Sequence, residues 1–398
     1  MIKNSILHIL SSVGTALFNL VVLILSARIL GAEGRGEITY LLFYCGFIQI
    51  FTGVVGNSVM IFMLTKLEEN SVLVISFIWT FFIALIVSPF LFYYDEFIES
   101  RIFLFLGITI LQSLFNNLTA LFSAKIQIQK LVFIKISQPL ILILLLVSNS
   151  GLDAKLFLTF LIISYLPSLV ILTKLTFWEN YKFNFSTLKS SFLIFIRLGA
   201  LNQLNYLMQY GCYRYAIWII ADKSNLSNVG VFGLWVTLVD ALWLIPISIA
   251  TINQTYMAKN QENKMNMNLC FISAGITLIL LVIALVIPLS VYQLFLGKDF
   301  NEIKHLLLIS SPAIIFFTFS ITLAYYFSAK GKIIYNTISS GVGFFVIILL
   351  SKLLIGKYGL IGAVLTNSIS YSLTTVVIIY LYKRYNRQSN NKACVSNA

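Results

Sequence analysis

Residues 27–37 read ARILGAEGRGE, a segment that holds three glycines, two arginines and two glutamates. It interrupts an apolar stretch that begins near residue 5 and resumes near residue 38. Glycine adopts positive φ without steric cost, so this segment predicts a tight turn between two apolar helices. Long apolar runs separated by short polar turns continue along the whole chain.

The composition is that of a membrane protein. The chain has 398 residues, of which 59% are hydrophobic and only 10% charged, whereas soluble domains carry about 25% charged residues. A helix needs about 20 mostly apolar residues to span the hydrocarbon core. Such runs lie at 5–28, 38–64, 71–93, 102–124, 131–149, 155–176, 193–220, 229–252, 268–295, 306–328, 333–356 and 360–382. We therefore predict an all-α polytopic membrane protein with about 12 transmembrane helices.

The net charge of +13 follows from basic loops and indicates no nucleic-acid surface, because the basic residues are scattered. Most lysines and arginines fall on the side of the N-terminus, and most acids fall on the other side. The positive-inside rule then places both termini in the cytoplasm. The first apolar run is too long for a signal peptide and lacks its cleavage site, so it is expected to be an uncleaved span.

Motifs for catalysis and cofactors are missing from the sequence. The four cysteines lie far apart and, with two histidines, give no metal-ligand spacing. No phosphate-binding G-x-x-x-x-G-K-[ST] occurs, so the chain is not expected to hydrolyse nucleotides. We predict neither a cofactor nor a metal, and no enzymatic activity.

Two short similarities indicate an internal repeat. FSAK occurs at 122–125 and at 327–330, each time at the end of the fourth span of a six-span half. The first turn has a counterpart in IIADKSNLSNVGVFGLW at 219–235. Six crossings return the chain to the same side, which predicts two parallel-repeat halves around a central cavity. The expected parts are 1–185, 186–382 and a basic cytoplasmic tail, 383–398.

Polar side chains form one stripe on each of two equivalent spans. On the first span the stripe contains His8, Ser12, Thr15, Asn19 and Ser26. On the seventh span it contains Asn202, Asn205, Tyr206, Gln209 and Tyr213. Such stripes would line a water-filled cavity, or they would form hydrogen bonds between helices in a dry bundle.

Three charged residues lie within or near the end of a span. Asp240 is near the middle of the eighth span, where an ionisable group is costly unless it is paired or hydrated. It is a candidate for ion or proton coupling, for holding a cavity arginine, or for a structural hydrogen bond. Arg214 is deep enough in the seventh span to bind an anionic substrate. Arg28 points away from the first stripe and is a weaker candidate, and either arginine could extend to the interface instead.

Several segments resemble the polysaccharide-transporter branch of the multidrug/oligosaccharidyl-lipid/polysaccharide exporter superfamily. They are ARILGAEGRGE, LFLGKDFNEIKHLLLISSPA (294–313) and KYGLIGAVLTNSISY (357–371). The last contains K-Y-G-x-x-G-A-x-x-x-N-x-x-x-Y, a pattern typical of that branch. Within the branch, the chain looks most like the O-antigen (Wzx-type) flippases.

This resemblance implies a bacterial inner-membrane protein that moves an oligosaccharide on undecaprenyl diphosphate to the periplasmic leaflet by alternating access. Its partners would be that substrate, membrane lipid, a polysaccharide polymerase and a chain-length regulator. Arg214 would bind the diphosphate or acidic sugars, and Asp240 would couple an ion. The candidate hydroxyl-binding residues are Asn19, Asn202, Asn205 and Gln209.

Two other functions are compatible with parts of the sequence. A small-molecule or drug exporter of the same superfamily would need an acid-rich cavity, and Asp240 is the deep acid. An O-antigen polymerase, which is an enzyme, usually carries a long periplasmic loop, and the longest outer loop here is short.

The choice between a cavity and a dry bundle can be tested by labelling. Asn205→Cys and Gln209→Cys are expected to react with a polar, membrane-impermeant thiol reagent, because a cavity admits water to the stripe. The readout is the fraction of protein labelled, and complete protection of both positions would favour the dry bundle.

Overall fold

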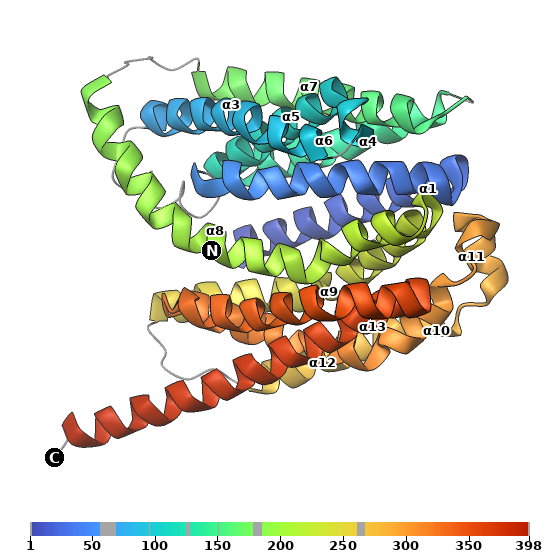
Figure 1. Cartoon of the computed structure of the whole chain (residues 1–398). Helices are drawn as coiled ribbons and strands as arrows, with labels where there is room; N and C mark the ends of the chain where they lie inside the picture. Colours follow the sequence, from blue (N-terminus) through green and yellow to red (C-terminus); the bar gives the residue numbers. More distant parts are fainter. Residues whose placement is uncertain are drawn as a thin grey trace. The chain divides into compact units, whose positions relative to one another are not determined.

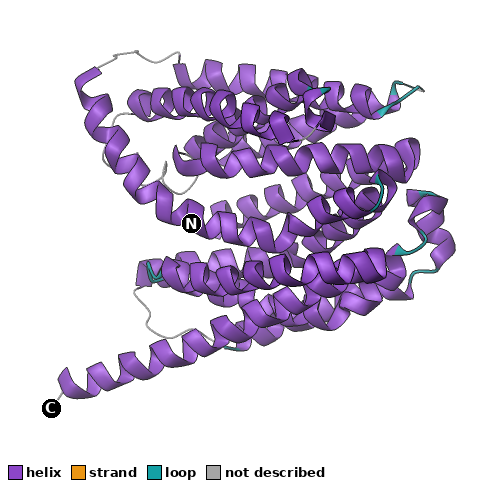
Figure 2. Ribbon diagram, in the orientation of Figure 1, coloured by secondary structure: helices purple, strands orange, loops and turns teal. Residues whose placement is uncertain are grey.

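The computed structural model describes residues 2–55, 69–94, 96–124, 128–149, 151–177, 185–260 and 267–396. Within these ranges all regular secondary structure is helical, which confirms the all-α prediction (Figure 2). The α-helices of Figure 1 are α1 (Ile2–Thr52), α3 (Glu69–Tyr94), α4 (Glu96–Glu99), α5 (Ile102–Ala124), α6 (Ile128–Val147), α7 (Ala154–Phe177), α8 (Phe185–Lys223), α9 (Leu226–Asn260), α10 (Asn268–Val286), α11 (Leu289–Leu296), α12 (Ile303–Ala329) and α13 (Ile333–Ser396). Two 3-10 helices, η1 (Gly53–Val55) and η2 (Lys298–Phe300), complete the described elements.

Each expected span except the ninth coincides with a helix over the described residues. Eight helices there are long and apolar enough to cross a membrane. Two of these, α1 and α13, are each divided by one glycine kink and so hold two expected spans apiece. The remaining two spans are the shorter apolar helix Val132–Val147 of α6 and the more polar α8. The end of the second expected span, beyond residue 55, lies outside the described residues.

The chain forms two compact units, Met1–Tyr206 and Leu207–Ala398, and the division falls within α8. In the first unit, α1 packs against α6, while α7 packs against α5 and α6. In the second unit, α12 is central, because it contacts α9, α10 and α13. Each unit therefore has its own helical core.

The glycine-rich segment makes its turn at a single residue. Gly31 has φ 66° and ψ −171°, and helix α1 continues directly after it. The expected tight turn is therefore made by Gly31 alone, since Gly34 and Gly36 are helical. Gly34 instead permits close packing, because a Cβ there would lie 3.0 Å from the Cβ of Leu30.

The second unit repeats this G-x-x-G arrangement in α13. Gly359 has φ 56° and divides the helix, as Gly31 divides α1. A Cβ on Gly362, three residues later, would lie 1.9 Å from the carbonyl oxygen of Leu354. The counterpart suggested by sequence, residues 219–235, has a different geometry, with a two-residue break after Lys223 and a hydrogen bond of 2.9 Å from the Asn228 backbone N–H to Asn225 Oδ1.

The two copies of FSAK occupy the same place in their units. Helices α5 and α12 both end on the alanine of the motif, and Phe122 and Phe327 are both buried. The ninth expected span, 268–295, differs from the structure, because α10 ends at Val286 and α11 begins after Pro288. Proline lacks a backbone N–H and favours the start of a helix, which explains the break.

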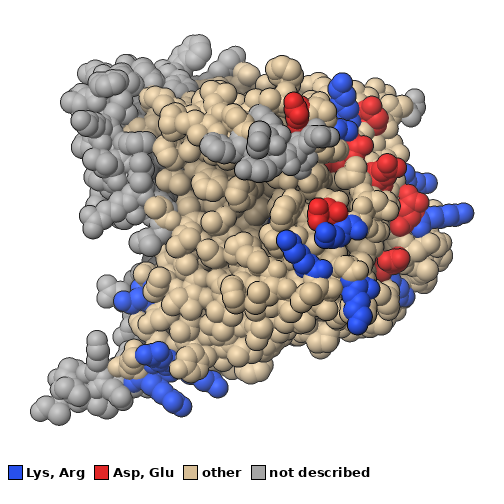
Figure 3. Space-filling view, in the orientation of Figure 1, with Lys and Arg blue, Asp and Glu red and all other residues tan. Residues whose placement is uncertain are grey.

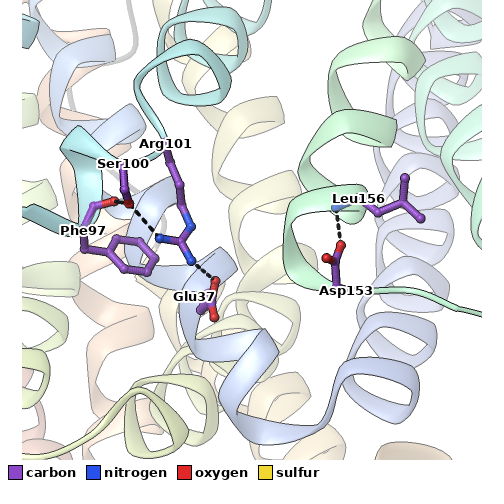
Figure 4. A network of polar contacts seen from close by, with 6 residues as sticks. All are labelled: Glu37, Phe97, Ser100, Arg101, Asp153 and Leu156. Carbon is purple, nitrogen blue, oxygen red and sulfur yellow. Dashed lines mark hydrogen bonds and ion pairs between the residues drawn. The ribbon is translucent and has the colours of Figure 1, made fainter.

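The charged end of the first unit is held by local contacts (Figure 4). Arg101 Nη2 lies 2.7 Å from Glu37 Oε2, and its guanidinium lies 4.0 Å from the centre of the Phe97 ring. Asp153 Oδ1 accepts a hydrogen bond of 2.6 Å from the backbone N–H of Leu156 at the start of α7. These contacts join α1 to the α4–α5 turn and cap α7.

The G-x-x-G geometry predicts unequal effects of two alanine substitutions. Gly362→Ala should lower the melting temperature, because its Cβ would overlap backbone atoms, and overpacking typically costs about 1–3 kcal/mol. Gly356→Ala is the matched control, since no heavy atom lies within 4 Å of its Cβ position. Thermal unfolding of the purified variants in detergent measures both, and equal melting temperatures would contradict the assigned close approach.

Candidate functional site

Arg214 and Asp240, singled out separately by sequence, form one ion pair. Arg214 Nη2 of α8 lies 2.5 Å from Asp240 Oδ2 of α9. Asp240 is at the midpoint of the apolar segment Leu226–Gln254. The exposed fractions of the two side chains are 27% and 41%, so the pair remains accessible.

Pairing explains how both charges can exist at this depth. A lone Arg or Asp at the centre of a spanning helix costs roughly 2.5–3.5 kcal/mol on insertion scales. In the pair, each charge neutralises the other, and the guanidinium keeps further N–H donors for a second anion. Of the roles considered for Asp240 from the sequence, pairing with an arginine is the one whose contact the structure contains.

An aromatic cluster lies next to the ion pair. It comprises Tyr213, Trp243, Phe317 and Tyr371, which come from α8, α9, α12 and α13. Every ring contacts the other three, with centroid distances between 4.8 and 6.2 Å. Trp243 also donates a hydrogen bond of 3.1 Å to the carbonyl oxygen of Ile314. Because Tyr213 precedes Arg214 and Trp243 lies one turn after Asp240, the cluster lies beside the pair.

Asn367 and Tyr371 complete the site, and neither was among the candidate residues named from the sequence. Asn367 Nδ2 donates to the hydroxyl of Tyr371 at 3.2 Å and to the carbonyl oxygen of Tyr213 at 3.4 Å. Its Oδ1 is buried and has no hydrogen-bond partner among the described residues. The signal was present in the N-x-x-x-Y spacing of residues 357–371, which places both side chains on one helix face.

The structure also places the remaining candidates of α8. Gln209 Nε2 donates a hydrogen bond of 2.9 Å to Tyr213 Oη, which connects it to the aromatic cluster. Asn202 and Asn205 are half-buried on the part of α8 that belongs to the first unit. Asn205 Oδ1 is buried without a hydrogen-bond partner among the described residues.

The candidates of α1 belong to the first unit. Asn19 is exposed, and Arg28 is exposed on the turn of helix before Gly31. The side chains of His8 and Ser12 lie outside the described residues. Ser26 is fully buried and accepts a hydrogen bond of 3.2 Å from Arg35 Nη1, so this member of the stripe connects the two sides of the Gly31 kink. Among the described residues, no group of three His, Cys, Asp or Glu side chains could hold a metal ion.

One curated protein with a similar sequence is the capsular polysaccharide biosynthesis protein CapF of Staphylococcus aureus. It is 28% identical over 246 residues, which cover 57% of this chain and 60% of that protein. The matched region thus spans less than two thirds of the relative. No protein-family model matches the chain.

Solved structures of transporters match nearly the whole chain. An inward-facing multidrug resistance MATE family transporter of the MOP superfamily has a TM-score of 0.72 at 12% identity, covering 98% of this chain and 99% of the other. The lipid II flippase MurJ, in an inward closed conformation, has a TM-score of 0.68 at 13% identity, covering 96% and 88%. MOP is the multidrug/oligosaccharidyl-lipid/polysaccharide exporter superfamily that the sequence resembles. The chain is a multi-pass helical membrane protein with the fold of the MOP superfamily transporters.

Proposed function

We propose that the chain is a flippase that moves a lipid-linked oligosaccharide, carried on undecaprenyl diphosphate, from the cytoplasmic to the periplasmic leaflet by alternating access. The proposal places the protein in a bacterial inner membrane with both termini in the cytoplasm. A polysaccharide polymerase and a chain-length regulator would act next on the product. The substrate would be the repeat unit of a surface polysaccharide, such as O-antigen.

Two similarities taken together carry the proposal. The sequence is similar to that of a protein named for capsular polysaccharide biosynthesis, and the chain has a fold that it shares with a lipid II flippase. A flippase for a lipid-linked sugar would account for both similarities. Sugar hydroxyls and a diphosphate cannot cross about 30 Å of hydrocarbon unaided, because they would lose their hydrogen bonds to water.

The ion pair supplies a mechanism for substrate binding and release. A diphosphate would compete with Asp240 for the guanidinium of Arg214, since both anions accept bidentate hydrogen bonds. A proton or cation taken up by Asp240 would release Arg214 for the substrate. Return of the free carboxylate would displace the diphosphate, which couples the substrate to an ion.

Neutral polar groups would bind the sugar. Asn19, Asn202, Asn205 and Gln209 are the candidates, and Asn205 Oδ1, which has no hydrogen-bond partner among the described residues, would accept a hydrogen bond from a sugar hydroxyl. Arg28 is a further candidate for an acidic sugar or for the diphosphate. These assignments follow from side-chain chemistry and position along the helices.

A drug exporter is the second candidate, because a multidrug resistance transporter shares the fold. An exporter of cationic drugs needs an acid that is free to bind the drug. Here the carboxylate of Asp240 is already neutralised by Arg214, which favours an anionic substrate. Drug resistance conferred on a sensitive strain, without restored surface polysaccharide, would favour the exporter.

Removing the charge of Asp240 should abolish transport. Asp240→Asn is expected to reach the membrane in normal amounts but to fail to complement a flippase-null strain. Without the Asp240 carboxylate, nothing would compete with the substrate diphosphate for Arg214, so the diphosphate would not be released. The measurement is surface polysaccharide, in parallel strains that lack an O-antigen flippase or a capsular flippase. The matched control is Glu37→Gln, which removes the acid of an ion pair at the end of the first unit. Full complementation by Asp240→Asn would remove the coupling role.

Removing the cation should trap the substrate in the cytoplasmic leaflet. Arg214→Ala is expected to weaken diphosphate binding by about 10- to 100-fold, because charge-assisted hydrogen bonds contribute roughly 1.5–3 kcal/mol. The measurement is lipid-linked oligosaccharide extracted from cells, with Arg101→Ala as the control. Unchanged surface polysaccharide would contradict the assignment.

A charge exchange separates binding from folding. The double variant Arg214→Asp with Asp240→Arg retains an ion pair between α8 and α9, so it should be stable but inactive if each charge has its own role. Restored transport in the double variant would indicate that the pair is only structural.

A further inference from the structure

One face of helix α13 carries a stripe of exposed apolar side chains. Ile369, Leu373, Val376 and Tyr380 are 38%, 37%, 52% and 60% exposed, and they recur every three or four residues on one helix face. Exposed apolar side chains on a spanning helix face lipid. The stripe thus marks the side of α13 that contacts the acyl chains, and Tyr380 is the last large apolar residue on it.

Three exposed cations continue the same stripe. Lys383, Arg384 and Arg387 follow Tyr380 at the same helical spacing. Viewed down the helix axis, these cations and the four apolar residues together lie within about 100° of arc. Arg387 is about 10 Å beyond Tyr380 along the axis, at 1.5 Å per residue. Side chains on a helix lean toward its N-terminus, which here is the direction of the membrane. The three cations therefore reach the level of the phospholipid headgroups.

The opposite face of this part of α13 is fixed by aromatic packing. The Tyr385 ring lies 5.9 Å from those of Phe327 and Tyr335 and 6.5 Å from that of Tyr326. Tyr326 Oη also donates to Asn386 Oδ1 at 3.4 Å. These contacts hold the end of α12 and the start of α13 against this opposite face, which leaves Lys383, Arg384 and Arg387 on the exposed face.

We define the basic patch as Lys383, Arg384 and Arg387, and Lys330 and Lys332 lie at the same end of the second unit. Among the described residues of the second unit, this end has no acidic side chain, and Figure 3 shows basic atoms without acidic ones where α13 emerges. The other end of the unit also has five cations: Lys223, Lys298, Lys304, Lys352 and Lys357. There, however, Asp222, Asp299 and Glu302 accompany them. Lys223 Nζ lies 3.2 Å from Asp222 Oδ2, so part of that charge is neutralised.

We infer that the basic patch is a binding site for the headgroups of anionic phospholipids. The stripe supplies contact with the acyl chains, and the patch supplies charge at headgroup depth, where no acid among the described residues competes with it. Juxtamembrane clusters of Lys and Arg attract anionic lipid, and each cation adds to the attraction. The aromatic contacts of Tyr385 keep the cations in place, so binding requires little reordering of the helix. The site is separate from Arg214 and Asp240 and does not depend on the proposed transport.

The inference can be tested with the full-length protein in an uncharged detergent. Phosphatidylglycerol is titrated against phosphatidylcholine, and bound lipid is counted by native mass spectrometry alongside the melting temperature. The triple variant Lys383→Gln, Arg384→Gln, Arg387→Gln should need roughly 10-fold more phosphatidylglycerol, or more, for the same binding. The wild-type protein should prefer phosphatidylglycerol over phosphatidylcholine.

Two further variants make the result specific. Lys298→Gln, Lys352→Gln, Lys357→Gln removes the same charge from the other end and should bind phosphatidylglycerol as the wild type does. Lys383→Arg, Arg384→Lys, Arg387→Lys keeps the charge and should also retain binding. The inference is overturned if both neutralised triples lose binding equally, if the patch variant binds like the wild type, or if inorganic phosphate alone gives the same stabilisation.

Discussion

The hydrocarbon core of the bilayer offers no hydrogen-bond partners, and the structure depends on this constraint. Every backbone N–H and C=O within it must be satisfied by the chain itself, which leaves helices as the means of crossing for segments like these. The same constraint limits turns to the membrane surfaces. Single glycines at Gly31 and Gly359 make two of these turns in the shortest possible length.

Polar side chains then specify how helices meet. In hydrocarbon there is little hydrophobic driving force between helices, so packing and hydrogen bonds decide the contacts. Trp235 Nε1 donates to Ser310 Oγ at 3.2 Å in the second unit, and Thr52 and Ser113 hydroxyls lie 3.0 Å apart in the first. Glycine adds close approach, as at Gly362 beside the Leu354 carbonyl.

The site follows from the same physics applied to charge. Asp240 can remain at mid-membrane because Arg214 accompanies it, and the four rings beside the pair hold both helices in register. Because each charge of the pair is stabilised only by the other, a second anion that binds Arg214 would disturb the pair. At the surface of the membrane, where charge is cheap, Lys383, Arg384 and Arg387 need no acidic partner.

Much of the fold was predictable from the sequence, because long apolar runs with short polar turns have one physical solution in a bilayer. The twelve spans and the all-α class followed from length and composition, and Asp240 and Arg214 stood out because charges are rare at that depth. Their pairing joins residues 26 positions apart, and the contact of Asn367 with Tyr213 joins residues 154 positions apart, which no local pattern encodes. Likewise, three glycines in ARILGAEGRGE all permit a turn, yet only the packed helices decide that Gly31 makes it. The sequence thus determined which segments enter the membrane, and the tertiary structure alone decided which polar groups meet there, because that depends on how helices distant in sequence pack side by side.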